Sequence, residues 1–439
     1  MTDALRQQAV ALYQRGLEQI TPEYLMRQAL AVEPERLVLT FLDRQEVLPI
    51  TPQTRFTLVA VGKAAAPMAA EAQRILGDRI RQGIVVTKRG FSIEGLPFPV
   101  HESGHPVPDE AGEQAADAVE TLVRDLHRDD VLLVLMSGGA SALLPAPIDG
   151  ITLTEKQELV RLMLRTNMDI HEINRVRKSV SRLKGGGLAV LAHPARVVGL
   201  CLSDVPGDDL GSIGSGLTVP EPVRFADVIA LLQQKGLWQQ VSAAVRKALE
   251  GGQSRPKRPP IPPINGLIGT NRHLLRAIQA AAEAAGFHAH THEQPTTGLN
   301  AAALPDLLRR WNALRVETGS DGRGLCLVSG GETTVEVRGK GLGGRCQELA
   351  ALMLPHIDGD WAFLAAGSDG NDGPTDAAGG VVDQESWQRI LSERIPYEAL
   401  LRNNDSYHLL ERSGNLIKVP PTRNNVMDVH LFLAPPSGE

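Results

Sequence analysis

Val131-Leu132-Leu133-Val134-Leu135-Met136-Ser137-Gly138-Gly139-Ala140-Ser141 is a continuous apolar run followed by a glycine loop. Six apolar residues in a row predict a strand that is buried on both faces, as in a parallel sheet covered by helices. Similar runs lie on either side of it, and helical patterns separate them. The expected strands are residues 56–61, 83–87, 131–136 and 197–202. This alternation predicts an α/β fold with a parallel sheet.

A proline-rich stretch interrupts this rhythm. Residues 251–264 contain five prolines, which favour an extended spacer over regular structure. The first fifty residues are helical in pattern, and strand–helix alternation resumes after residue 264. We therefore expect two α/β domains around a cleft, at residues 1–250 and 265–439, with the N-terminal one Rossmann-like and its sheet mainly parallel.

The composition is that of a globular protein. The 439 residues are 42% hydrophobic and 22% charged, and the net charge of -6 gives no support for a nucleic-acid partner. No apolar run approaches the roughly 18 residues of a membrane span, and the N-terminus lacks a signal peptide's pattern. The three cysteines are widely spaced with no CxxC, which favours a reduced cytoplasm and argues against structural zinc.

Basic and polar residues follow the predicted strands, where ligands bind in parallel sheets. Lys63 stands between a buried strand and a helix, a position suited to neutralising a nucleotide phosphate. The spacing is not a Walker A loop, because Thr57 stands where its first glycine should be, and no GxGxxG follows this strand. The alternative is a lysine at the rim of the sheet.

The glycine loop at 137–141 predicts an anion cradle. Ser137, Gly138, Gly139 and Ser141 would offer backbone N–H groups and hydroxyls at a helix start. A tight turn with a capping serine is the competing interpretation. A helix near residues 173–183 adds a basic face that includes Arg177, and Lys184 follows it; part of this face is expected to be merely solvated.

A second glycine-rich stretch lies at 325–348. We interpret it as a buried strand, a Ser329-Gly330-Gly331 loop, a half-buried strand from Glu332 to Arg338, and a helix from about Glu348. The intervening loop, with Gly343 and Gly344, would let its backbone approach a ligand. Arg345 follows with a fork of donors suited to phosphate or carboxylate. The alternative is a glycine-rich hairpin with a surface arginine.

Two loops are rich in aspartate. One carries Asp204, Asp208 and Asp209, and the other carries Asp369, Asp372 and Asp376. Carboxylates opposite basic, glycine-rich loops suit Mg²⁺ that is held through water and phosphate oxygens. Turn-capping aspartates exposed to solvent are the competing interpretation. Lysine, arginine, glycine loops and carboxylates are together the parts needed for phosphoryl transfer.

The ordered motifs resemble those of the class II glycerate 2-kinases, which combine an N-terminal kinase domain with a C-terminal MOFRL domain. The resemblance covers nearly the whole chain. The motifs that carry it are 61–65, 137–141, 174–178, 184–186, 203–209, 329–332, 343–348, 369–376 and 404–407.

The resemblance implies phosphorylation of D-glycerate on its 2-hydroxyl by ATP with Mg²⁺, giving 2-phospho-D-glycerate. It implies Lys63 and Arg345 as essential basic residues and Asp204 and Asp208 as base or metal ligands. The substrate- and phosphate-binding set would be Ser137, Gly138, Gly139, Ser141, Arg177, Lys184, Ser329, Gly330, Gly331, Glu332, Gly343 and Gly344. The metal set would be Asp204, Asp208, Asp369, Asp372 and Asp376.

Two other functions stay open. Some members of this family carry the label hydroxypyruvate reductase, although the absent dinucleotide fingerprint speaks against NAD(P)H here. The other alternative is a relative that binds nucleotide or hydroxy acid without catalysis. We expect a cytoplasmic protein with no nucleic-acid or membrane partner, and a homodimer is left open.

Overall fold

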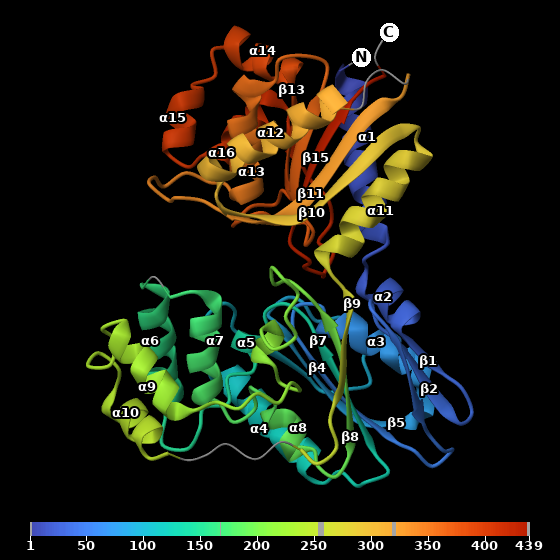
Figure 1. Cartoon of the computed structure of the whole chain (residues 1–439), viewed down its shortest axis with the longest axis vertical. Helices are drawn as coiled ribbons and strands as arrows, with labels where there is room; N and C mark the ends of the chain where they lie inside the picture. Colours follow the sequence, from blue (N-terminus) through green and yellow to red (C-terminus); the bar gives the residue numbers. More distant parts are fainter. Residues whose placement is uncertain (1, 167, 253–258, 318–321, 437–439) are drawn as a thin grey trace. The chain divides into compact units, whose positions relative to one another are not determined.

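The computed structural model describes residues 2–166, 168–252, 259–317 and 322–436. The chain forms two compact units. The N-terminal unit spans Pro22–Gly269, and the C-terminal unit combines Met1–Thr21 with Thr270–Glu439. Each unit is built on its own six-stranded sheet (Figure 1).

The N-terminal unit contains the predicted parallel sheet. Its strand order is β6-β5-β4-β7-β8-β9, and every neighbouring pair is parallel. The strands are β4 (Phe56–Val61), β5 (Ile80–Lys88), β6 (Val100–Ser103), β7 (Val131–Met136), β8 (Arg196–Leu202) and β9 (Ile264–Gly269). Numbered along this sheet alone, the order is 3-2-1-4-5-6, that of a Rossmann fold, and the order reverses between β4 and β7. The predicted α/β class, with a Rossmann-like N-terminal domain and a parallel sheet, is confirmed.

Burial explains why these strands form. All six residues of β4 and all six of β7 are buried. The helices α4 (Glu110–Arg124) and α8 (Gly187–Leu191) pack against one face of the sheet through an alanine- and leucine-rich core. The helix α3 (Ala65–Leu76) packs on β4 and β5 and begins directly after Lys63 and Ala64. The sheet is thus held rigid next to the loops that follow its strands.

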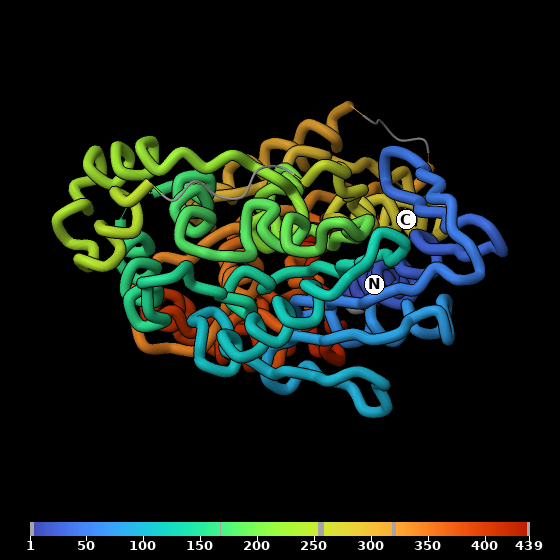
Figure 2. The backbone as a smooth tube through the Cα atoms, turned by 90° about the horizontal axis from the view of Figure 1, so that it is seen from below, coloured from blue at the N-terminus to red at the C-terminus, as the bar shows by residue number. Residues whose placement is uncertain are grey.

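Two smaller parts flank this sheet at opposite ends (Figures 1 and 2). One has its own core of four helices, α6 (Leu153–Leu164), α7 (Ile170–Ser179), α9 (Phe225–Gln234) and α10 (Ala243–Glu250). The other is an antiparallel sheet of β1 (Leu30–Val32), β2 (Arg36–Thr40) and β3 (Gln45–Pro49). The prediction of helix throughout the first fifty residues is therefore wrong after Ala29. Alternating burial of Leu37 and Leu39 in β2 is a strand pattern.

The C-terminal unit has a mixed sheet in the order β10-β11-β15-β12-β13-β14. The β10–β11 pair is parallel and the other pairs are antiparallel. The strands are β10 (Phe287–Leu299), β11 (Gly324–Thr334), β12 (Ala362–Gly367), β13 (Gly379–Asp383), β14 (Leu416–Ile417) and β15 (Asp428–Ala434). The helices α1 (Thr2–Glu18) and α11 (Asn271–Ala284) cover one face; α12 (Asn300–Glu317) and α13 (Arg345–Met353) cover the other (Figure 1).

The two units differ from the predicted domain boundaries. The helix α1 packs on α11, where Gly16 is required because a Cβ there would lie 2.4 Å from Ile278. The strand β9 pairs with β8 inside the N-terminal sheet. The unit boundaries therefore fall at residues 21/22 and 269/270 instead of in the 251–264 spacer. Residues 253–258 of that spacer lie outside the described residues.

Candidate functional site

The loops after β4 and β7 are tied together at the point where the strand order reverses. The Ala64 N–H donates to Ser137 Oγ at 3.0 Å, and the Lys63 N–H donates to the Gly138 carbonyl at 2.9 Å. Gly62 has a φ of +133°, and a Cβ there would lie 2.2 Å from Ser137 Oγ. Ser137 is buried, so its hydroxyl joins the two loops. This differs from the ligand-binding role predicted for it.

Asp204, which follows β8, lies against the same loop. A Cβ at Gly138 would lie 2.3 Å from Asp204 Oδ2, so only glycine allows the carboxylate to approach this backbone. Burial raises the pKa of Asp204, and the nearby charge of Lys63 opposes that shift. The structure thus brings the predicted residues Lys63, Gly138 and Asp204 together at the carboxyl ends of three neighbouring strands.

The loop after β7 keeps unused hydrogen-bond donors. Within the described part of the chain, the N–H groups of Gly138 and Gly139 have no acceptor. Gly139 has a φ of +87°, and a Cβ there would lie 3.1 Å from the His105 ring. Burial, with the charges of Lys63 and Lys88, lowers the pKa of His105 to about 4, so this imidazole is neutral near pH 7. These donors fit the anion cradle that the sequence predicts.

A pocket of about 210 Å³ opens beside this loop. Its lining includes Gly139, Ser141 and Asp204 from the strand ends and Asn174 and Arg177 from α7. Its remaining lining residues are His105, Pro106, Pro108, Ala142, Lys156, Val160, Ile170, Lys184, Val205, Ser212 and Gly214. The pocket therefore combines a carboxylate, several cations and a glycine-bounded wall at the end of a parallel sheet, where ligands bind in such folds.

The cations of this pocket differ in their partners. Lys184 Nζ is buried and donates to the carbonyls of Ser141 and Leu144 at 2.8 and 2.9 Å. Lys156 Nζ is also buried and donates to the carbonyls of Pro145 and Val180. Both lysines hold backbone carbonyls of the wall, which differs from the phosphate-binding role predicted for Lys184. Arg177 has no such partner among the described residues.

Asp208 and Asp209 lie on the loop after β8 with different roles. Asp208 has a φ of +57°, and its Oδ1 is buried without a hydrogen-bond partner in the described structure. Asp209 accepts from the Ser212 hydroxyl at 2.7 Å and from the Gly211 N–H at 3.2 Å, so it holds a turn. An unpaired carboxylate oxygen is the kind of ligand that a hard cation takes, which fits the predicted metal role of Asp208.

In the C-terminal unit, Arg345 is the first residue of α13. Its Nε and Nη2 donate to the two carboxylate oxygens of Asp428 at 2.6 and 2.9 Å. Its Nη1 lies 3.0 Å from Glu332 Oε1. The Arg345 side chain is 31% exposed and that of Asp428 is fully buried. Glu332, predicted to bind phosphate, forms an ion pair with Arg345.

The predicted Ser329-Gly330-Gly331 loop is wrong, because these residues continue β11: all three pair with β15, and Ser329 and Gly331 also pair with β10. The glycines serve close packing: a Cβ at Gly330 would lie 2.1 Å from Asn271, and one at Gly331 would lie 2.1 Å from the Thr296 carbonyl. The predicted strand over 332–338 ends at Thr334. Ser329 is buried, so contact with a ligand would need local opening.

The glycine loop before Arg345 packs on another loop of its own unit. Asn404 Oδ1 accepts from the N–H groups of Arg338 and Gly339, and Asn403 Oδ1 accepts from that of Lys340. Gly343 and Gly344 follow, and Cβ atoms there would lie 2.2 Å from Ser406 and 2.2 Å from Asp372 respectively. The backbone donors of residues 338–340 are thus already paired. Residues 335–344 form an irregular loop between β11 and α13, so the hairpin alternative is wrong, and the phosphate-binding role of Gly343 and Gly344 stays a prediction.

The second acidic loop does not form the predicted metal cluster. Asp372 Oδ2 accepts from the Gln347 N–H at 2.8 Å and so caps α13. Asp376 is exposed and accepts from Lys418 Nζ at 2.9 Å and the Tyr407 hydroxyl at 2.7 Å. Asp369 holds the Asn371 N–H at 3.1 Å. In residues 2–166, 168–252, 259–317 and 322–436 no group of three or more His, Cys, Asp or Glu could hold a metal.

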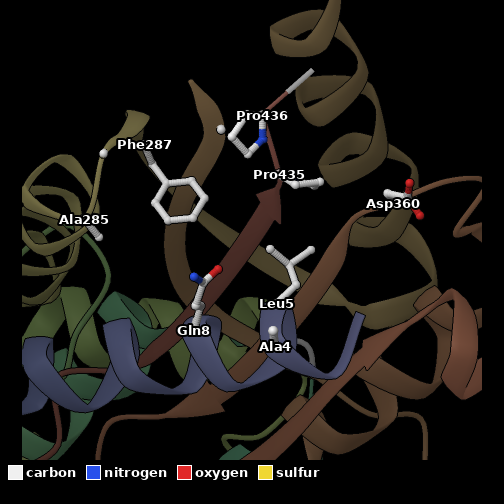
Figure 3. Close-up of a pocket in the computed structure, with 10 residues that line it drawn as sticks. Ala4, Leu5, Gln8, Ala285, Phe287, Asp360, Pro435 and Pro436 are labelled. Atoms are coloured by element: carbon white, nitrogen blue, oxygen red, sulfur yellow. The ribbon is translucent and has the colours of Figure 1, made fainter. Parts of the chain in front are cut away.

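A further pocket of about 280 Å³ lies in the C-terminal unit (Figure 3). It is formed by Leu5 and Gln8 of α1, Phe287 at the start of β10, and Pro435 and Pro436 after β15. The described residues that line it include no lysine, arginine or histidine. The pocket of the N-terminal unit, which is lined by cations, is therefore better suited to an anionic ligand.

Three residues of these sites were missed from the sequence. His105 and Asn174 line the N-terminal pocket, and Asp428 anchors Arg345. Asn174 and Asp428 each stand in a polar stretch near a basic or glycine-rich motif, which is a weak signal. For His105 the only signal is its place in a Gly-His-Pro loop between a predicted strand and a predicted helix.

Comparisons with known proteins cover both units. A family model described as a domain of unknown function (DUF4147) matches residues 8–250, and the MOFRL family model matches residues 325–428. A D-glycerate 2-kinase of Thermotoga maritima is 40% identical over 94% of this chain and 99% of the relative. A human glycerate kinase is 35% identical over 98% of this chain and 94% of the relative.

Solved structures give the same picture. The crystal structure of a glycerate kinase from Thermotoga maritima matches with a TM-score of 0.86 and 34% identity, covering 98% of this chain and 100% of that chain. A protein from Pyrococcus horikoshii matches with a TM-score of 0.81 and 31% identity, covering 98% of each chain.

Proposed function

The chain belongs to the glycerate kinase family, and we propose that it transfers the γ-phosphoryl group of ATP to the 2-hydroxyl of D-glycerate. The products are ADP and 2-phospho-D-glycerate. The observation that carries this proposal is the meeting of Lys63, the Gly138 backbone and Asp204 beside a small pocket at the switch point of the sheet. A cation, free N–H donors and a carboxylate are what phosphoryl transfer to an alcohol requires.

Asp204 is the proposed general base. It lines the pocket, and its raised pKa makes its carboxylate a stronger proton acceptor than an exposed aspartate. As the acceptor oxygen bonds to phosphorus and the bond to ADP breaks, the hydroxyl proton passes to Asp204. Lys63 lies close enough to act on the Asp204 charge and can neutralise charge that develops on the phosphoryl oxygens.

Asp208 is the proposed magnesium ligand. Its buried, unpaired Oδ1 fits a hard cation, which when bound neutralises charge on phosphate oxygens. The proposal leaves Asp372 and Asp376 out of the metal site, because each already has hydrogen-bond partners within its own unit. Arg345 stays a proposed catalytic residue on the strength of the family resemblance, with Asp428 and Glu332 as the groups that orient it.

We also propose a cytoplasmic enzyme. All three cysteines, Cys201, Cys326 and Cys346, are buried free thiols, which suits a reducing compartment. No helix within the described residues is both long and apolar enough to cross a bilayer. Whether the enzyme works as a monomer or a homodimer can be measured by light scattering under the conditions of the assay.

An ADP-release assay with ATP, Mg²⁺ and a panel of hydroxy acids tests the reaction. We expect ADP release with D-glycerate, and the ³¹P and ¹H spectra of the product should be those of 2-phosphoglycerate. Formation of 3-phosphoglycerate contradicts the proposed regiochemistry. NADH oxidation with hydroxypyruvate and no ADP release would favour the reductase, and binding without turnover would favour a non-catalytic relative.

A further inference from the structure

We infer that Arg177 binds the carboxylate of the acceptor and so restricts the pocket beside Asp204 to small hydroxy acids. The inference deepens the proposed kinase function and rests on it. It identifies the group that would distinguish an acid from an uncharged alcohol of the same shape. Its support comes from the partners of the charged residues around the pocket and from the pocket's size.

Among the described residues, Arg177 is the pocket cation that still lacks a partner. The Nζ groups of Lys156 and Lys184 are buried and hold backbone carbonyls. Arg177 is half-buried, and no described residue forms a hydrogen bond or an ion pair with its guanidinium. Burial lowers the pKa of Arg177 with no carboxylate near enough to offset it. Because buried charges in proteins are normally paired, the missing partner is most simply a ligand anion.

The other two basic residues of α7 are less suited than Arg177 to bind a ligand in this pocket. Arg175 is exposed, and Lys178 forms an ion pair with Glu221. Neither lines the pocket, whereas Arg177 does. A guanidinium presents two parallel N–H donors that match a carboxylate, so it can fix the acid group as well as neutralise it.

Asn174, one turn before Arg177 on α7, can donate a second hydrogen bond to the acceptor. It is buried, and its Oδ1 accepts from the Ser215 hydroxyl at 3.2 Å. That hydroxyl is in turn 2.8 Å from Ser141 Oγ, whose residue also lines the pocket. With Oδ1 occupied, the amide N–H₂ of Asn174 is left as a donor, and the described residues offer it no acceptor. It therefore supplies a second donor beside Arg177 for an acidic or hydroxyl oxygen.

The size of the pocket sets the class of ligand. Its volume of about 210 Å³ is below the range of about 300–1,000 Å³ that holds drug-sized ligands. A three- or four-carbon hydroxy acid fits this space better than a nucleotide. Arg177 and Asp204 line the same pocket, so an acid group held at Arg177 leaves the rest of a short acceptor near the proposed base.

The test compares D-glycerate with D-glyceramide, which keeps its shape but lacks its charge. We expect the wild-type enzyme to prefer D-glycerate strongly. Arg177→Gln should raise KM for D-glycerate by about 10- to 100-fold, reduce the preference over D-glyceramide by a similar factor, and leave KM for ATP within a few-fold. Arg177→Lys should recover part of the affinity because it restores charge without the fork. Arg175→Gln, which removes an exposed arginine of the same helix, is the matched control and should behave as wild type.

Two further measurements separate a binding role from a structural one. Removing an unpaired, half-buried cation should leave Tm unchanged or slightly raised, whereas loss of a structural arginine would lower it. Calorimetric titration with D-glycerate and no ATP should show binding to wild type and to Arg175→Gln, and none to Arg177→Gln at the same concentrations.

The outcomes distinguish the two proposals. If the wild type phosphorylates D-glycerate but Arg177→Gln keeps the acid-over-amide preference, the inference about Arg177 is overturned and the proposed function stands. If no hydroxy acid is phosphorylated yet D-glycerate binds in an Arg177-dependent way, the proposed function fails and the carboxylate site stands. A lowered Tm for Arg177→Gln with unchanged D-glycerate binding also overturns the inference.

Discussion

The guanidinium of Arg345 and the carboxylate of Asp428 form a two-point ion pair, with Nε 2.6 Å from Oδ2 and Nη2 2.9 Å from Oδ1. Asp428 is the first residue of β15 and is fully buried. Arg345 begins α13 and keeps 31% of its side chain exposed. The pair thus joins a helix start to a strand start, and it gives the arginine a fixed orientation that its sequence position alone does not suggest.

Arg345→Ala should lower both stability and turnover. Without Arg345 the buried Asp428 carboxylate loses its counter-charge, which costs about 3 kcal/mol of unfolding free energy when a buried pair is broken. An arginine that stabilises transferring phosphoryl charge is worth about 10³-fold or more in rate. Urea denaturation and steady-state kinetics measure the two losses separately. Arg345→Lys should rescue little turnover, because lysine lacks the planar fork.

A double variant separates the two roles of Arg345. Arg345→Ala combined with Asp428→Asn removes the uncompensated buried charge, so much of the lost stability should return. Turnover should stay at the level of Arg345→Ala if the guanidinium acts in catalysis. Recovery of turnover along with stability would instead make Arg345 a purely structural residue.

The aspartates of the β8 loop should give different kinetic phenotypes. Asp204→Asn removes the proposed base and should lower kcat by about 10²- to 10⁴-fold with little change in KM for D-glycerate. Asp208→Asn removes a ligand oxygen and should mainly raise the Mg²⁺ concentration needed for half-maximal rate. Titrations of rate against Mg²⁺ at saturating ATP and D-glycerate distinguish these effects.

Asp376→Asn is the control for the aspartate pair. Asp376 is exposed and bonded to Lys418 and Tyr407, so its loss should leave the Mg²⁺ requirement unchanged. If Asp376→Asn raised the Mg²⁺ requirement as much as Asp208→Asn, the assignment of the metal to the β8 loop would be wrong.

Sequence patterns predicted the N-terminal sheet because its strands are apolar on both faces, so that Phe56–Val61 and Val131–Met136 stand out from the helices between them. The polar ends of those strands also led to Lys63, Gly138 and Asp204, since parallel strands place their carboxyl ends at one edge. These three residues could be predicted to lie close together because the order and direction of the strands decide which loops meet at one edge of the sheet.

Other features depend on contacts between distant residues and left no local pattern. The sequence Gly330-Gly331 is typical of a loop, but both residues lie within a strand. Glycine is needed there because Asn271 and Thr296 approach the strand too closely for a Cβ. The glycine-rich pattern before Arg345 predicts free N–H groups, but Asn403 and Asn404, more than sixty residues away in the sequence, accept from those of residues 338–340. The helix α1 likewise belongs to the C-terminal unit because it packs against α11 near Ile278. The sequence of α1 itself gives no indication of this distant partner.

Lys63→Met should change the titration of His105 as well as the rate. Burial is the larger cause of the low pKa of His105, and the charge of Lys63 adds to it. Removing that charge should raise the pKa of His105 from about 4 while leaving it below 6.5, and turnover should fall by about 10²-fold or more. NMR titration of the imidazole measures the shift. His430, whose low pKa has no contribution from Lys63, is the internal control and should not move.

Stability should depend on pH through two buried groups of the C-terminal unit that act in opposite directions. Burial lowers the pKa of His430 from 6.5 to about 4, so its contribution is fully present above pH 6.5 and is lost as pH falls towards 4. Burial, reinforced by the charge of Asp428, raises the pKa of Asp372 from 3.8 to about 7. Its contribution is therefore fully present below pH 3.8 and is lost as pH rises towards 7.

Between pH 4 and 6.5 these two contributions nearly cancel in the wild type, so single variants should reveal them. His430→Gln removes the first, and the slope of unfolding free energy against pH should become more negative by up to about 1.4 kcal/mol per pH unit. Asp372→Asn keeps an oxygen to accept from the Gln347 N–H but cannot ionise, and its slope should become more positive by a similar amount. Urea denaturation at several pH values across this window measures both slopes. Parallel curves for wild type and both variants would mean that neither group titrates differently in the folded and unfolded chains, and the burial argument for this pair would fail.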